Sequence, residues 1–247
     1  MRAHWLETGT GMDLLREESR QVAGAFESIF GDQFLQIGIW GDPALFRRYA
    51  RTRRYAVVAP VSGPGVDFLS APEDLAVATD SIDAVFLPHV LETTADPHAV
   101  LREVDRILRP DGHVVITGLN PWGWWGVRHY LSRLKFPTGG QRMVSEFRLR
   151  DWLHLLDYHV QPARFHHIAP PVYRLSPSVE APPPQVDRDA GQWPLPAAHF
   201  RRWHPLASCY LLLARKEVFT VTPIRPVFRR RAQLVGSLAN PSTRNAA

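Results

Sequence analysis

The stretch TDSIDAVFLPHVLETTADPHAVLREVDRILRPDGHVVITGLN, residues 79–120, decides the fold. Its first apolar run, residues 82–87, predicts a strand buried on both faces of a sheet. Asp96 followed by Pro97 is typical of an N-cap and a first helical residue, and apolar residues then recur at helical spacing. After an RPDG turn, residues 113–117 predict a second buried strand. A strand, a crossover helix and a strand within about 30 residues indicate a parallel βαβ unit.

The edge of such a sheet is where a ligand is expected. In open parallel sheets, ligands bind beyond the carboxyl ends of the strands. The two predicted strands place residues 88–92 and 118–125 at that edge. Both segments therefore become candidate parts of a binding site.

The rest of the chain continues the alternation of helices and strands. We expect helices over residues 12–30, 42–49 and 145–156, and strands over 34–37, 55–59, 66–69, 159–166 and 210–214. This pattern predicts an α/β fold with a doubly wound, mostly parallel sheet. A proline-rich insertion, residues 169–208, separates the last two strands and fits a terminal antiparallel strand. We expect one domain over residues 1–216, followed by a tail over 217–247.

Composition limits the class of protein. The chain has 247 residues, of which 45% are hydrophobic, as is ordinary for a globular protein. Its single cysteine, Cys209, excludes an internal disulfide and favours a reducing, cytoplasmic location. The first 25 residues lack the apolar centre of a signal peptide, and no apolar run is long enough to span a bilayer.

The positive charge belongs to the tail. Residues 215–247 hold seven Lys or Arg and one acid, whereas the whole chain has a net charge of +5, so the remainder is slightly acidic. Prolines and the run Arg229–Arg231 predict a disordered tail. Two hypotheses remain for it: a solvated tail that aids solubility, or a weak contact with RNA or another polyanion.

Several separated motifs resemble one family. Residues 80–83, 89–92, 96–101 and 108–112 resemble the class I S-adenosylmethionine-dependent methyltransferases, in particular those with a methyltransferase type 11 domain. The resemblance covers roughly residues 30–165. The tract GLNPWGWWGVRHYL and the later pair Phe165-His166 resemble a proteobacterial branch with a degenerate glycine-rich motif. The resemblance implies a Rossmann-like fold, S-adenosyl-L-methionine as cofactor, and methyl transfer to an unidentified acceptor, a small molecule rather than RNA or protein.

The first half of the resemblance departs from the family pattern. The family's first loop reads acid-x-Gly-x-Gly-x-Gly, but here Gln36 stands for the acid, Trp40 for the second glycine and Asp42 for the third. The acid expected on the ribose hydroxyls falls near Ala59-Pro60, where no side chain can accept hydrogen bonds, and Ala71 replaces the next acid. Loss of the ribose carboxylate alone would weaken binding roughly ten- to hundredfold.

The resemblance also implies which residues hold the cofactor. The cofactor set consists of residues that follow the first, third and fourth strands: Gly38, Gly41, Glu73, Asp74, Leu75 and His89. Each has an alternative explanation. These are a purely conformational role for the glycines in a strand-to-helix turn, a surface loop for the acidic segment, and a partly buried histidine satisfied by backbone.

The segment after the fifth strand is the predicted acceptor face. Its residues are Asn120, Trp122, Trp124, Trp125 and His129. Tryptophans there can stack on a planar substrate or enclose a cation, or they can form a hydrophobic lid or a packing surface. A base such as the histidine is needed only if the nucleophile must lose a proton, so no catalytic residue is assigned.

No metal site is expected. The pair His166-His167 has no acid or cysteine at ligand spacing in the sequence.

Two functions compete at this point. One is an active methyltransferase. The other, suggested by Trp40, Ala59 and Ala71, is a catalytically inactive protein of the same fold that acts as a cofactor sensor or as a protein- or RNA-binding module. A Rossmann dehydrogenase is disfavoured because the glycine fingerprint is incomplete and no acid closes the second strand.

Overall fold

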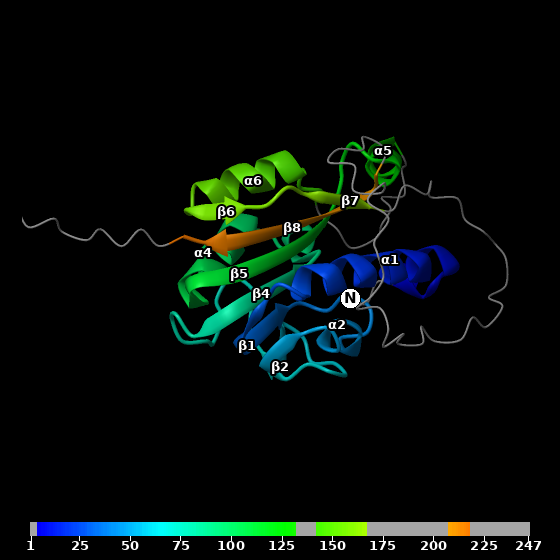
Figure 1. Cartoon of the computed structure of the whole chain (residues 1–247). Coiled ribbons are helices and arrows are strands. Elements are labelled where there is room, and N and C mark those ends of the chain that lie inside the picture. The colour runs from blue at the N-terminus through cyan, green and yellow to red at the C-terminus, as the bar shows by residue number, and fades with distance from the viewer. Residues whose placement is uncertain (1–3, 132–141, 167–206, 218–247) are drawn as a thin grey trace, which may run out of the picture.

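The computed structural model describes residues 4–131, 142–166 and 207–217 (Figure 1). Its helices are η1 (His4–Glu7, a 3-10 helix), α1 (Gly9–Phe26), α2 (Ala44–Arg47), α3 (Val90–Thr93), α4 (Pro97–Ile107), α5 (Trp124–Leu131) and α6 (Glu146–His154). Its strands are β1 (Phe30–Ile37), β2 (Arg51–Ala59), β3 (Phe68–Leu69), β4 (Ile82–Pro88), β5 (Leu108–Leu119), β6 (Tyr158–Val160), β7 (Arg164–His166) and β8 (Cys209–Lys216).

One sheet organises the molecule. Its strand order is β3-β2-β1-β4-β5-β8-β6, with β7 also paired to β8. The strands from β1 to β5 are parallel, and β8 runs antiparallel to β5, β6 and β7. The predicted α/β fold with a terminal antiparallel strand is therefore confirmed. The order reverses between β1 and β4, so a ligand is expected beyond the carboxyl ends of these two strands.

The opening βαβ stretch forms as predicted, with one difference. The Asp96 carboxylate accepts hydrogen bonds from the His98 and Ala99 amides, both at 3.0 Å, and so caps α4. The helix ends at Ile107, and the RPDG segment belongs to β5 rather than to a turn before it. A register shift in the pairing with β4 absorbs the extra residues, and Asp111 takes a positive φ of 65° there.

Helices cover both faces of the sheet. Apolar residues of α1 and α2, such as Phe26 and Phe46, pack on one face against Phe86. Residues of α4 and α6, such as Val104, pack on the other face against Val85. Neighbouring residues of one buried strand thus point into opposite cores, as the alternation of side chains along a strand requires.

Other predicted boundaries are corrected by the structure. The first strand begins at Phe30, because its backbone already pairs with Arg51. The helix predicted over residues 42–49 shortens to α2, and the strand predicted over 159–166 divides into β6 and β7. Most of the proline-rich insertion, residues 169–208, and nearly all of the tail, 217–247, lie outside the described residues.

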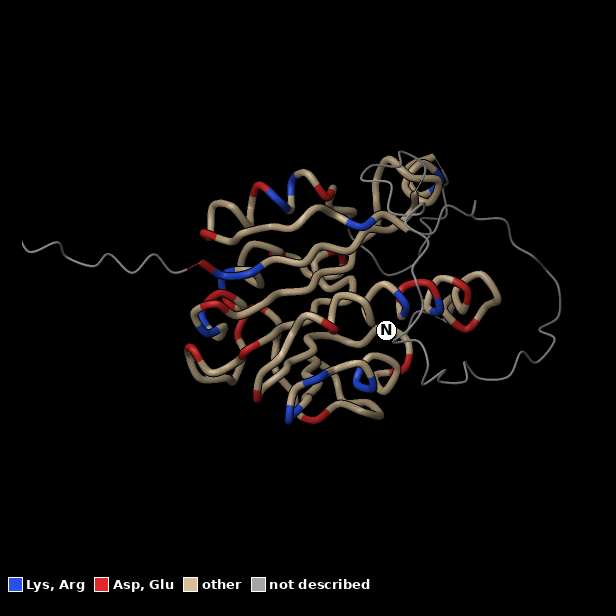
Figure 2. The backbone as a smooth tube through the Cα atoms, viewed as in Figure 1, with Lys and Arg blue, Asp and Glu red and all other residues tan. Residues whose placement is uncertain are grey.

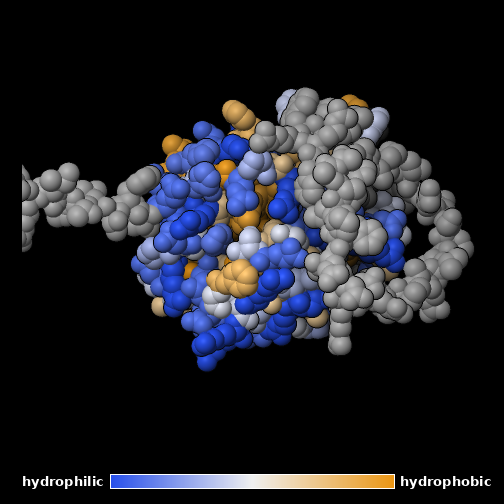
Figure 3. Space-filling view, viewed as in Figure 1, coloured by the Kyte–Doolittle hydropathy of each residue, from blue (hydrophilic) through white to orange (hydrophobic). Residues whose placement is uncertain are grey.

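The described surface is that of a charged globular domain. Acidic and basic residues are interspersed along the described elements (Figure 2). The face in the space-filling view is largely hydrophilic, with small apolar areas between charged groups (Figure 3). Among the described residues, no helix combines the length and apolarity that crossing a bilayer requires.

Candidate active site at the carboxyl edge of the sheet

Four residues from separate elements meet at the carboxyl edge, and we call them the His89 cluster: Glu18 on α1, Trp40 after β1, His89 after β4, and Glu92 on α3. The carboxylate of Glu18 accepts from His89 Nε2 at 2.6 Å and from the Trp40 indole N–H at 2.6 Å. His89 Nδ1 lies 3.1 Å from the Glu92 carboxylate. The other oxygen of Glu92 accepts from the Leu119 amide at the end of β5. The cluster therefore ties α1 to the ends of three parallel strands.

The backbone of His89 is in the left-handed region. Its φ is 53° and its ψ is 20°, at the N-cap position of α3. A non-glycine residue in this region is uncommon and persists where its surroundings hold it. Here the ring has a carboxylate on each nitrogen, and the Trp40 indole stacks on its face with centroids 4.0 Å apart. The conformation is thus fixed by the cluster around the ring.

Electrostatics keep Glu18 and His89 ionised although both are buried. Burial alone would raise the pKa of Glu18, but the charge of His89, its hydrogen bond and the nearby His166 ring lower it to about 2. Burial alone would lower the pKa of His89, but the charges of Glu18 and Glu92 raise it to about 10. One imidazolium between two carboxylates leaves a surplus of negative charge at this edge.

The predicted cofactor glycines have the positive φ that their loop requires. Gly38 has a φ of +87° and Gly41 a φ of +66°. A Cβ at Gly38 would lie 2.6 Å from the Val90 side chain, and one at Gly41 would lie 3.0 Å from the Leu15 side chain. Both glycines therefore make room for other parts of the protein, as the conformational alternative expects. Their contact with a cofactor stays a prediction.

The predicted adenine-binding loop already satisfies much of its own polar backbone. The Leu75 amide donates to Glu103 at 2.9 Å, and Leu75 itself is buried. Glu73 accepts from the Thr94 hydroxyl, whereas Asp74 is exposed. Asp74 is thus the acid of this loop that faces solvent. The assignment of these three residues to adenine recognition stays a prediction.

The predicted acceptor residues do not converge on one space. The Trp125 side chain is fully buried, and its ring lies 5.4 Å from that of Trp5. Trp122 and Trp124, by contrast, are 76% and 42% exposed. The Asn120 side chain is buried, and it donates to the Ala207 carbonyl and accepts from the Trp122 amide. His129 is also buried. Packing therefore accounts for Trp125, and an acceptor role of the five residues stays a prediction.

The cofactor that the family implies fits this edge only in part. The surplus of negative charge suits a sulfonium cation. At the end of β2, however, Ala59 and Pro60 offer no side-chain acceptor for the ribose hydroxyls. Two residues after Gly38, where the family loop has a second glycine, the buried side chain of Trp40 instead contacts Glu18 and His89. As arranged here, these side chains do not present the usual set of donors and acceptors.

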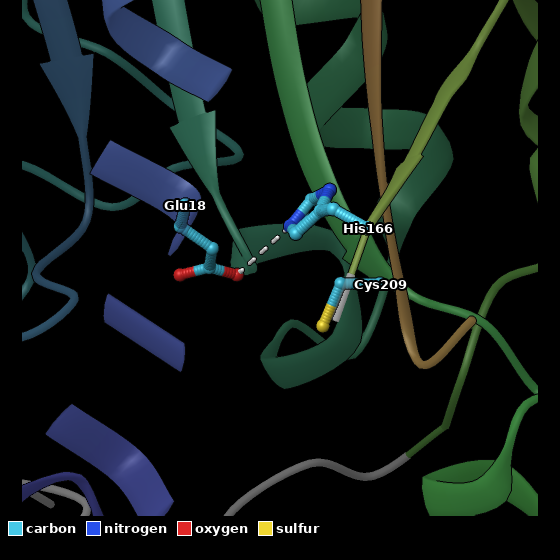
Figure 4. Close-up of side chains that lie close together, drawn as sticks. All are labelled: Glu18, His166 and Cys209. Carbon is cyan, nitrogen blue, oxygen red and sulfur yellow. Dashed lines mark ion pairs between the residues drawn. The ribbon is translucent and has the colours of Figure 1, made fainter. Parts of the chain in front are cut away.

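The tertiary structure also assembles residues that the sequence did not bring together. Glu18, His166 and Cys209 are all buried, and one ligand atom from each lies within 4.8 Å of the other two (Figure 4). The expectation that His166 has no acid or cysteine partner is therefore wrong, because Glu18 and Cys209 lie close to it in the folded chain. A signal for Glu18 did exist, because it stands three residues after Leu15 and four before Val22, on the apolar face of the predicted helix.

Comparisons with known proteins agree with this architecture. Residues 47–116 match the family model described as a methyltransferase domain. The chain is similar to the "Uncharacterized protein YafS" of Escherichia coli (strain K12), with 34% identity over 152 residues, 61% of this chain and 62% of that protein. The match therefore spans less than two thirds of that relative's length.

Solved structures share the fold at low identity. One is a methyltransferase of Thermotoga maritima, described as a possible histamine N-methyltransferase, with a TM-score of 0.56 and 14% identity over 87% of this chain and 93% of that one. Another is a methyltransferase of Archaeoglobus fulgidus, with a TM-score of 0.56 and 15% identity over 83% of this chain and 94% of that one. The chain thus carries a segment that matches a methyltransferase domain, within a fold that it shares with these solved S-adenosylmethionine-dependent methyltransferases.

Proposed function

We propose that the protein binds S-adenosylmethionine at the carboxyl edge of the sheet and transfers its methyl group to a small-molecule acceptor. The observation that carries this proposal is the His89 cluster. It places two buried carboxylates and one imidazolium at the reversal of strand order between β1 and β4. The family match over residues 47–116 supports the same class of cofactor.

The arrangement sets one steric condition on this function. Trp40 is 9% exposed and His89 is 1% exposed, so neither side chain offers an open surface as placed. Trp5 of η1 lies against Trp40, with ring centroids 5.6 Å apart. A ligand that enters the space of the Trp40 indole therefore has to displace that indole, and with it the contact to η1.

A second function has its own support. The Trp40 indole fills a glycine position of the family loop and is anchored at both its N–H and its face. The Leu75 amide, in the predicted adenine loop, is used within the protein. These observations favour a catalytically inactive protein that keeps the fold and acts as a sensor or a binding module.

Calorimetry on the full chain separates the two functions. Titration with S-adenosylmethionine and S-adenosylhomocysteine is expected to give saturable binding by the wild type. Ala59→Asp places a carboxylate at the end of β2, and it should tighten binding roughly ten- to hundredfold, because a hydrogen bond to a charged group is worth about 1.5–3 kcal/mol. Leu155→Asp adds the same charge at a residue that is 77% exposed at the C-cap of α6, and it should change nothing.

Two outcomes would contradict the leading proposal. No heat from the wild type at millimolar cofactor, together with binding by Ala59→Asp combined with Trp40→Gly, would identify a fold that has lost its ligand. Equal gains from Ala59→Asp and Leu155→Asp would show that charge alone, and not the end of β2, governs the affinity. Turnover is then measured as S-adenosylhomocysteine formed in the presence of candidate acceptors.

A further inference from the structure

We propose that Glu18, His166 and Cys209 form a binding site for a divalent cation of borderline softness, with Zn²⁺ as the best match. The three residues come from α1, β7 and the start of β8, and their side chains gather at one point beside the sheet (Figure 4). A carboxylate oxygen, an imidazole nitrogen and a thiolate are all common ligands of Zn²⁺. Three protein ligands leave one position of a tetrahedral ion open.

The distances are close to those that a metal requires. The three ligand atoms lie within 4.8 Å of one another, and His166 Nε2 is 4.0 Å from Glu18 Oε1. In a tetrahedral zinc site with bonds of 2.0–2.3 Å, ligand atoms are about 3.3–3.6 Å apart. A contraction of roughly 1 Å would therefore complete the coordination. Side-chain rotations suffice for such a change.

An independent observation comes from His166. Its side chain is 1% exposed, yet neither ring nitrogen has a hydrogen-bond partner among the described residues. A buried polar group without a partner costs free energy, so such groups in native proteins call for an explanation. The Nε2 atom faces the Glu18 carboxylate across a gap that a cation would bridge. A metal bound there would give Nε2 its partner.

The charge of the surroundings also suits a cation. The carboxylates of Glu18 and Glu92 outnumber the single imidazolium of His89 in this buried region. Binding would break the Cys209 S–H bond, form a metal–sulfur bond and release the proton to solvent. The thiolate and the surplus carboxylate then offset the two charges of the ion.

The thiolate sets the selectivity. Soft sulfur ligands favour Zn²⁺ and disfavour Mg²⁺ and Ca²⁺, which prefer sites made of oxygen atoms. Cys209 is the single cysteine of the chain, so any metal–sulfur signal reports on this one position.

The test uses the tag-free, full-length protein and Co²⁺ as a spectroscopic probe. We expect one Co²⁺ per chain, a sulfur-to-cobalt charge-transfer band in the near ultraviolet, and displacement of the band by Zn²⁺. Cys209→Ser should abolish the band. His166→Ala should weaken Co²⁺ binding at least about a hundredfold, because even outer-shell partners of a metal are worth roughly 10–100-fold. His159→Ala, a change at an exposed histidine of β6, serves as the control and should bind like the wild type.

Three results would contradict the proposed metal site. The proposal fails if the wild type gives no charge-transfer band, if the band survives Cys209→Ser, or if His166→Ala binds Co²⁺ as tightly as the wild type. Circular dichroism of each variant shows that a lost band does not reflect a lost fold. The readout involves no S-adenosylmethionine, so its failure is independent of the proposed methyl transfer.

Discussion

The indole of Trp40 stacks on the imidazole of His89, with 4.0 Å between ring centroids and 28° between ring planes. The same indole donates to the buried carboxylate of Glu18. Trp40, which stands where the family loop has a glycine, thus joins the ends of β1 and β4 to α1. Because these three side chains contact one another in the core, we expect substitutions among them to change the stability of the protein.

Trp40 should contribute strongly to stability. Trp40→Ala removes a large buried side chain and is expected to lower the free energy of unfolding by about 3–5 kcal/mol. Trp122→Ala is the matched control, because Trp122 is 76% exposed, and it should change that free energy by less than about 0.5 kcal/mol. Urea unfolding monitored by far-ultraviolet circular dichroism measures both. Similar losses in the two variants would show that Trp40 is not a packing residue.

Glu18 should be more sensitive than its neighbour on α1. Glu18→Gln keeps the shape but removes the charge that faces His89, and the loss of one partner of a buried pair is expected to cost about 3 kcal/mol. Glu17→Gln changes an acid whose contacts, to Gln21 and Arg20, lie on the partly exposed side of the helix. That control should cost less than about 1 kcal/mol. Equal effects in the same unfolding assay would contradict the buried ion pair.

Gly38 and Val90 should be energetically coupled. Gly38→Ala has to accommodate a φ of +87° and a contact of 2.6 Å with Val90. The left-handed conformation alone is expected to cost about 1–2 kcal/mol. In the double variant with Val90→Ala the contact disappears, so the combined loss should be at least about 0.5 kcal/mol smaller than the sum. Gly9→Ala, which meets nothing within 4 Å, is the control. Strict additivity in a double-mutant cycle would contradict the steric argument.

Asp83 should make stability depend on pH. Burial alone would raise the pKa of its carboxyl group, but hydrogen bonds from the Gln33 amide, the Arg109 guanidinium and the Asp32 amide hold it below the usual 3.8. Because the pKa is lower in the folded state, the stabilisation is complete above the unfolded value and is lost as the pH falls through the folded value. Asp83→Asn should therefore cost about 2 kcal/mol at pH 7 and progressively less below a pH of about 4.

Denaturant unfolding of the wild type and Asp83→Asn at several pH values measures this difference. Asp13→Asn is the control, because the Asp13 side chain is 68% exposed and pairs with Arg16 on the helix surface. Its effect should stay within about 0.5 kcal/mol at every pH. A gap between the wild type and Asp83→Asn that widened towards acid would reverse the assigned direction of the pKa shift.

The features that the sequence predicted best are those that depend on residues close together in the chain. The N-cap at Asp96, the proline after it and the helical spacing of apolar residues were sufficient for the βαβ unit, because each depends on residues within a few positions of one another. The RPDG segment was wrongly assigned to a turn. It lies within β5 as an irregularity, since Leu108 before it and His113 after it both pair with β4, and the register shift between them takes up the four residues.

The candidate site was predicted less completely. His89 was identified at the carboxyl edge, but the carboxylate on its Nε2 atom belongs to Glu18, 71 positions away. The tryptophans after β5 were all predicted to form the acceptor face, yet Trp125 is in the core and Trp122 is exposed. Trp122 lies in the turn before α5 and Trp125 in its first turn, and the sequence alone does not say which side of α5 faces the protein.

The sequence by itself determined the parallel sheet, its crossover helix and the edge at which a ligand is expected, because periodicity and capping act over short distances along the chain. Only the tertiary structure decided that Trp40 packs on His89 and that Glu18, His166 and Cys209 share one buried space. The physical reason is that α1 and β8 lie at opposite ends of the described chain, and the packing of the sheet, not any local pattern, brings their side chains together.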